Sequence, residues 1–221
     1  MSDFPTSMDQ LSAEWLSSVL GYEVRSFSVE PLGAGGGLLG MVTRVTLDSD
    51  QGPDTMIAKF PTQAPENRAV AATYDMYGRE YNFYTQIAPS VSIRASRCYH
   101  AEINQDTGDF VLLLEDLKGY ILGDQVAGCT AAQAHQVIES MATLHRNTWQ
   151  PDHIEDIVQH DMPFQREGMK MGYQVGWPNV IANFSHLLDV ELTEVLGSMP
   201  AHIDELLDRL HQGPQIGRAH V

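Results

Sequence analysis

The sequence predicts an α+β fold in which an antiparallel sheet comes first and helices follow. In residues 1–115, short alternating or apolar segments are separated by turn residues, and a single long helical pattern is inserted among them. After residue 116 the apolar residues recur only at helical spacing. A chain of 221 residues, 43% of them hydrophobic, is long enough to bury a substantial core.

The first predicted elements are a helix and two strands around a glycine cluster. Apolar residues at helical spacing over 11–20 stop at Gly21, which predicts a helix packed outside the sheet. Segments 24–29 and 41–47 alternate as strands do. Between them lie the glycines of 33–40, so strand, glycine loop and strand is the simplest assignment.

The next elements are a strand, a long helix and a hairpin. Residues 51–54 form a turn before a strand over 55–60, and 61–67 form a loop. The pattern from about 69 to 87 is helical and ends before Pro89. Two strands, 97–103 and 110–114, enclose a turn-forming segment and predict a hairpin.

The C-terminal half is predicted to be helical around an irregular stretch. Thr130 and Gln133 have the form of a capping box that opens a helix reaching Trp149. Residues 150–183 show no order that we can assign, and helical patterns over 187–199 and 203–210 are separated by Pro200. The helix that begins at the capping box is expected to bury one face, which comprises Ala134, Val137, Ile138, Met141 and Leu144.

Composition excludes several classes of protein. Thirteen Lys and Arg against 29 Asp and Glu give a formal net charge of −16, which repels nucleic acid and anionic membranes. No segment approaches the roughly 20 apolar residues of a membrane span, and no basic start precedes an apolar run. We expect a cytoplasmic protein without a nucleic-acid or membrane partner. A few fixed donors in a cleft could still bind a nucleotide.

The two cysteines, Cys98 and Cys129, suggest neither a disulfide framework nor a metal site. They are too few for the former and lack the paired spacing of zinc ligands. We expect two buried thiols and no metal site in this chain.

The glycine cluster is a candidate phosphate-binding loop. Small residues between two strands let backbone amides approach a phosphate closely. No helix follows the cluster and no Gly-Lys-Ser/Thr closes it, so it is neither the dinucleotide fingerprint nor a Walker loop. An ordinary glycine-rich hairpin is the alternative. The candidate residues are Gly33, Gly35, Gly36 and Gly37.

Lys59 and Glu80 are a candidate ion pair. Lys59 is predicted on the same side of its strand as Ile57, where an ammonium needs an anionic partner. Glu80 falls on the apolar stripe of the long helix, between Met76 and Tyr84, where a carboxylate needs a cation. The alternatives are a lysine that reaches water from a strand end and a glutamate exposed at the edge of its helix.

The apolar run of residues 110–114 predicts a strand buried on both faces. Glu115, Asp116 and Leu117 follow it directly. By itself this tripeptide indicates only that a strand ends.

In this order, the features resemble the N-terminal half of the aminoglycoside phosphotransferase superfamily, particularly its ecdysteroid kinase-like (CHK kinase-like) branch. Segments 79–84, 98–100 and 144–149 are also similar to that branch, and the resemblance covers about residues 30–150. It implies a protein-kinase-like fold of two lobes. An ATP-binding lobe over 1–116 would carry the antiparallel sheet with one long helix, and 117–215 would be an incomplete helical lobe.

The resemblance also implies an activity, the transfer of the γ-phosphate of ATP to a hydroxyl of a small molecule. Lys59 would hold the phosphates, Glu80 would orient Lys59, and the glycine loop would cover the phosphates. Glu115, Asp116 and Leu117 would form the hinge and bind adenine through their backbone. Aminoglycosides, steroids, choline-like amines and sugars all remain open as acceptors. The fragment is expected to bind ATP weakly, since the cleft needs the second lobe as its floor.

The catalytic loop of the family, His-Gly-Asp with a following Asn, does not occur in this sequence. His145 is interpreted as a core histidine and 160–161 as a surface pair. Residues 216–221 resemble the translation of a sequencing adapter. We therefore expect the catalytic residues and the Mg²⁺ ligands beyond residue 215, in a longer protein, and an inactive fragment here.

Two other functions remain open. One is a noncatalytic nucleotide-binding pseudokinase or interaction module. The other is an unrelated α+β ligand-binding domain, which would be favoured if Lys59 and Glu80 lay far apart.

Overall fold

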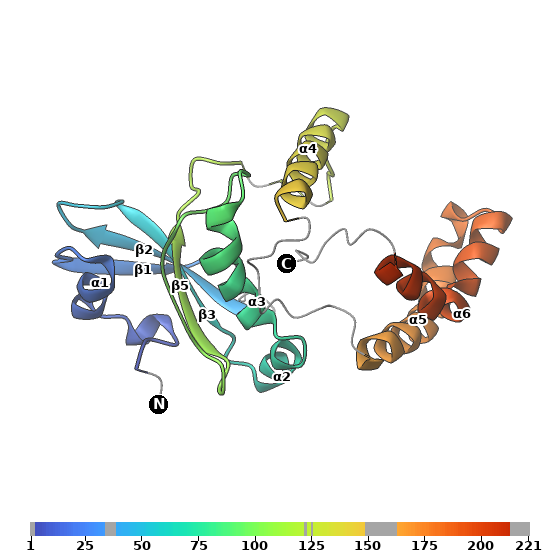
Figure 1. Ribbon diagram of the computed structural model, residues 1–221, viewed down its shortest axis with the longest axis horizontal. Helices are drawn as coiled ribbons and strands as arrows, with labels where there is room; N and C mark the ends of the chain where they lie inside the picture. Colours follow the sequence, from blue (N-terminus) through green and yellow to red (C-terminus); the bar gives the residue numbers. More distant parts are fainter. Residues whose placement is uncertain (1–2, 34–38, 122, 125, 149–162, 213–221) are drawn as a thin grey trace. The chain divides into compact units, whose positions relative to one another are not determined.

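The computed structural model describes residues 3–33, 39–121, 123–124, 126–148 and 163–212. Within them lies the predicted sheet, whose five strands are antiparallel in the order β1-β2-β3-β5-β4 (Figure 1). This confirms the α+β class and the antiparallel sheet. The strands are β1 (Ser26–Pro31), β2 (Gly40–Asp48), β3 (Thr55–Pro61), β4 (Cys98–Asn104) and β5 (Asp109–Glu115).

One face of the sheet is covered by α1 (Ala13–Leu20), as predicted, after a short 3₁₀ turn at Met8–Gln10. The Ser12 hydroxyl accepts a hydrogen bond from the Trp15 amide and caps the start of α1, which ends at Gly21 in the left-handed conformation (φ 75°). Leu16 is completely buried against the sheet. The core on this face includes Val45, Leu47, Met56, Ala58, Phe60, Val111 and Leu113.

The other face packs against α2 (Pro65–Thr73) and α3 (Met76–Asn82) (Figure 1). The Tyr77 ring lies 4.7 Å from the Phe110 ring, and its hydroxyl donates a hydrogen bond of 2.6 Å to the Leu39 carbonyl. β5 contributes Val111 and Leu113 to one core and Leu112 and Leu114 to the other. The expectation that this strand is buried on both faces is confirmed.

The single helix expected from about 69 to 87 is divided into shorter pieces. Asp75 adopts a left-handed backbone (φ 47°) that stops α2 and starts α3 in a new direction. After α3 the chain makes a π turn at Phe83–Ile87 and a 3₁₀ turn at Ala88–Ser90, which contains Pro89. The apolar periodicity predicted a helical segment but could not show the break at one aspartate.

Helix α4 (Ala131–Asn147) begins with the predicted capping box, in which Thr130 and Gln133 exchange hydrogen bonds. The expectation that α4 buries one face is wrong for three of its residues, because Val137, Ile138 and Met141 are exposed. His145 is half-buried and is not a core residue. Cys98 is half-buried and Cys129 is exposed, so the expectation of two buried thiols is also wrong for the second cysteine.

The helices α5 (Pro163–Phe184) and α6 (Val190–Gln212) form a separate compact unit, with a 3₁₀ turn at Ser185–Leu187 between them. Residues 163–183 were expected to be irregular, yet they are helical through Pro178. Pro200 was expected to separate two helices but lies inside α6. A proline within a helix removes one backbone hydrogen bond, and the helix continues on both sides of it here. The two helices are joined by the ion pairs Arg166–Asp208 and Lys170–Asp204.

The other compact unit takes in the described residues up to Asn147. None of the described helices is both long enough and apolar enough to cross a bilayer. The predicted boundary at residue 116 stays a prediction, and the tail 216–221 and residues 160–161 lie outside the described residues.

Candidate functional site

β3 places Lys59 on the face of the sheet that α3 covers. Along this strand Met56, Ala58 and Phe60 point into the core beneath α1. Ile57 and Lys59 therefore lie on the opposite face, because side chains alternate along a strand. The Lys59 side chain keeps only 25% of its exposure, so its charge needs a partner.

That partner is Glu80, in the second turn of α3. The Lys59 ammonium forms a hydrogen-bonded ion pair with Oε1 of Glu80, whose side chain is 26% exposed. The structure thus brings together two predicted site residues that are 21 positions apart in the chain. Neither a lysine turned to bulk water nor a glutamate at an exposed helix edge describes this pair.

The glycine loop enters the sheet close to Lys59. Its first residue, Gly33, has φ 88°, a conformation that side chains rarely adopt, and Gly35, Gly36 and Gly37 lie outside the described residues. The loop leads into β2 at Gly40, which is opposite Pro61 at the end of β3. The ends of the loop are therefore near the end of β3 that carries Lys59.

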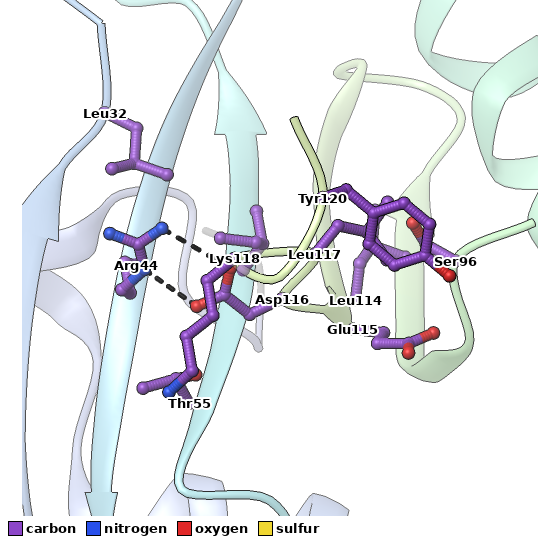
Figure 2. Close-up of a pocket in the computed structure, with 11 residues that line it drawn as sticks. Leu32, Arg44, Thr55, Ser96, Leu114, Glu115, Asp116, Leu117, Lys118 and Tyr120 are labelled. Carbon is purple, nitrogen blue, oxygen red and sulfur yellow. Dashed lines mark hydrogen bonds and ion pairs between the residues drawn. The ribbon is translucent and has the colours of Figure 1, made fainter. Parts of the chain in front are cut away.

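An open pocket of about 660 Å³ lies along the same unit of the chain, at the hinge end of β3 and β5. Its volume is within the usual range for small-molecule sites. Ile57, two residues before Lys59 on the same face, is part of its wall. Figure 2 shows most of the lining, which comprises Leu32, Arg44, Thr55, Ile57, Ser96, Leu114, Glu115, Asp116, Leu117, Lys118 and Tyr120.

Backbone hydrogen bonds of the predicted hinge engage the Glu115 amide but not the Leu117 amide. The Glu115 amide donates to the Arg97 carbonyl at 2.8 Å, and the Lys118 amide bonds the Asp116 carboxylate. Among the residues that the structure describes, the Leu117 amide has no hydrogen-bond partner, while its carbonyl accepts from Tyr120 at 2.8 Å. The Leu117 amide is therefore available to donate a hydrogen bond to a planar ligand in the pocket.

The Asp116 side chain fixes the predicted hinge to the sheet. It is 4% exposed and accepts a hydrogen bond of 2.7 Å from Nε of Arg44 on β2 (Figure 2). Burial tends to raise the pKa of Asp116, but hydrogen bonds from Arg44 and Thr55, with the Arg44 charge, lower the pKa below its ordinary value. Asp116 is thus ionised and closes the β2 side of the pocket.

The residues that the sequence analysis did not find include Arg44 and Tyr120 in the pocket wall. They also include Arg94, which pairs with Glu115 of that wall. A charged residue that interrupts an apolar pattern can be recognised in a sequence, as Glu80 was. Arg44 lies on a strand that alternates normally, and Arg94 and Tyr120 lie in segments without periodicity. Arg94 pairs with the Glu115 carboxylate at 2.5 Å, so both acidic hinge side chains are neutralised by arginines.

Comparison with known proteins decides which family this geometry belongs to. The model of the ecdysteroid kinase-like family matches residues 34–212, most of the chain. The chain belongs to the ecdysteroid kinase-like family. Curated protein sequences give no match. Among solved structures, a mutant aminoglycoside 2′-phosphotransferase IIIa in complex with GDP is similar, with a TM-score of 0.46 and 14% identity over 87% of this chain. This ecdysteroid kinase-like chain spans 59% of that protein's length.

The described part of this ecdysteroid kinase-like chain holds no group of three His, Cys, Asp or Glu side chains that could bind a metal ion. These residues therefore do not fit a magnesium site of their own. The expectation that Mg²⁺ acts in a longer protein stays a prediction, and we derive no step through it.

Proposed function

We propose that the chain is the nucleotide-binding part of an ATP-dependent phosphotransferase acting on a hydroxyl of a small molecule. Residues 1–116 would form the ATP-binding lobe and 117–215 part of a helical lobe. The observation that carries the proposal is the Lys59–Glu80 ion pair, on the same sheet face as a pocket lined by the hinge.

The pair supports this function because it provides a fixed cation in an acidic protein. With a net charge of −16, the chain as a whole repels a nucleotide triphosphate. The Lys59 ammonium could bind phosphate oxygens, and Glu80 would hold that ammonium on the ligand side of the sheet. The ends of the glycine loop are near the same end of β3, where backbone amides could cover the phosphates.

The base would occupy the pocket beside the hinge. Leu32, Ile57 and Leu114 supply apolar wall, and the Leu117 amide supplies a donor for a ring nitrogen of adenine. In the transfer itself, the acceptor oxygen bonds to the γ-phosphorus, the bond from that phosphorus to the bridging oxygen breaks, and ADP leaves. The acceptor proton passes to a general base, which none of the residues assigned here provides.

Calorimetry with ATP tests the proposed site. We expect Lys59→Ala to raise the Kd for ATP about ten- to hundredfold, as the loss of a charged hydrogen bond to phosphate would. Lys170→Ala is the matched control, because Lys170 is ion-paired on α5, outside the pocket, and its loss should leave the Kd unchanged. ATP binding that survives Lys59→Ala in a variant with an unchanged melting temperature would contradict the assignment.

A further inference from the structure

We infer that Tyr120 is the ring on which the nucleobase stacks, and that Arg94 positions this ring. The inference rests on the proposed function and assigns a part of the site that family membership does not. It is carried by the position of Tyr120 in the pocket wall and by the contacts that hold it there.

Tyr120 is brought to the pocket by a tight turn after the hinge. Its amide donates a hydrogen bond of 2.8 Å to the Leu117 carbonyl, so the chain folds back on itself just beyond β5. The ring lines the pocket, yet it is 62% exposed. Figure 2 shows it apart from Arg44 and Leu32, with the segment Asp116–Lys118 between. An exposed aromatic ring in a pocket wall provides a surface for a planar ligand.

Arg94 fixes the orientation of that ring. Its guanidinium lies over the Tyr120 ring at 5.8 Å from the centroid and pairs with the Glu115 carboxylate at 2.5 Å. Glu115 in turn accepts a hydrogen bond of 3.1 Å from the Arg97 amide at the start of β4. The ring is therefore tied to the sheet through two strands. Arg94 also shares a side-chain hydrogen bond with the Tyr120 hydroxyl, and the large exposure of Tyr120 leaves ring surface for a base.

The arrangement gives the base two walls within one compact unit. Ile57 and Leu32 come from the sheet, and Tyr120 comes from the segment after the hinge. All of them lie in the unit that ends at Asn147, so stacking on Tyr120 needs no residue of α5 or α6. The base would then bind without the second lobe, contrary to the expectation from the sequence. We therefore expect nucleosides to bind the 221-residue chain.

Binding of adenosine and of ATP to the full chain tests this inference. We expect Tyr120→Ala to raise the Kd of both ligands by the same factor, roughly five- to hundredfold, because base stacking on an aromatic ring is lost. Tyr120→Phe keeps the ring and should stay within about twofold. Arg94→Gln should weaken both ligands less than Tyr120→Ala does. Arg25→Gln is the control, since Arg25 pairs with Asp48 and Asp50 and does not line the pocket.

The outcomes separate this inference from the proposed function. Equal adenosine binding by the parent chain and Tyr120→Ala overturns the stacking role, whatever ATP does. If adenosine binding depends on Tyr120 but Lys59→Ala leaves ATP binding unchanged, the stacking role stands and the phosphate site of the proposed function fails. A parent chain that binds neither ligand overturns both.

Discussion

At the scale of single residues, ion pairs on one face of the sheet organise the candidate site. Lys59 is held by Glu80, and Arg44 joins β2 to Asp116 in the hinge. The two pairs differ in burial, because the Asp116 carboxylate is almost completely removed from water. Breaking a pair at a buried carboxylate is costly, since the remaining charge loses its partner.

We predict that Asp116→Asn lowers the free energy of unfolding at pH 7 by about 1–3 kcal/mol. The folded-state pKa of Asp116 is lowered, so its stabilising contribution is complete above the ordinary aspartate pKa of about 3.9 and is lost as the pH falls through the lowered value. The difference between parent and variant in urea unfolding should therefore shrink below about pH 4.

Asp50→Asn is the control for this prediction. Asp50 also pairs with an arginine, Arg25, but is largely exposed, so its loss should barely move the melting temperature. An equal effect of the two substitutions, or a difference at Asp116 that does not change with pH, would show that the Arg44–Asp116 pair does not hold the hinge.

Some of these residues could be predicted from the sequence and others could not. Lys59 and Glu80 break apolar patterns, and a charge in an apolar pattern indicates a partner. Arg44 breaks no pattern, and its partner lies 72 residues away, at a distance that only the strand order β2-β3-β5 makes short. Tyr120 follows a strand without any periodicity, so its place in the pocket depends on one turn.

At the scale of elements, the break between α2 and α3 sets the position of Glu80. The left-handed backbone of Asp75 separates α3 from α2, and the Asp75 carboxylate lies against Gly78. Periodicity predicted the helical segment because apolar residues continue across the break. Strands and the hairpin were predictable for the same reason, whereas prolines within α5 and α6 misled the prediction.

We predict that Gly78→Ala destabilises the protein by about 1 kcal/mol, although alanine favours a helix over glycine by a similar amount. A Cβ at position 78 would collide with the Asp75 carboxylate, which must then leave the start of α3. Denaturant unfolding measures the effect.

The double variant reveals the cause. In an Asp75→Gly background the collision is absent, and Asp75→Gly itself keeps the left-handed backbone accessible. Gly78→Ala should then become stabilising by up to about 1 kcal/mol. The same sign in both backgrounds would mean that Asp75 does not restrict position 78.

At the scale of the whole molecule, the chain is strongly acidic, with a formal net charge of −16, so the few lysines decide where an anionic nucleotide could bind. The chain has only three lysines, Lys59, Lys118 and Lys170. Lys59 pairs with Glu80 on the pocket face, Lys118 lines the pocket, and Lys170 lies on α5 in the other compact unit. If the chain binds ATP as proposed, only Lys59 should meet its γ-phosphate.

The most direct test is labelling with an acyl phosphate of ATP. In this reaction a lysine amine attacks the acyl carbon beside the γ-phosphate, an amide forms, and the bond to the phosphate oxygen breaks so that ATP is released. Peptide mass spectrometry should find Lys59 labelled above Lys118 and Lys170, with excess ATP suppressing the label. Labelling of Lys118 or Lys170 at the level of Lys59, or labelling of Lys59 that ATP does not suppress, would contradict the account.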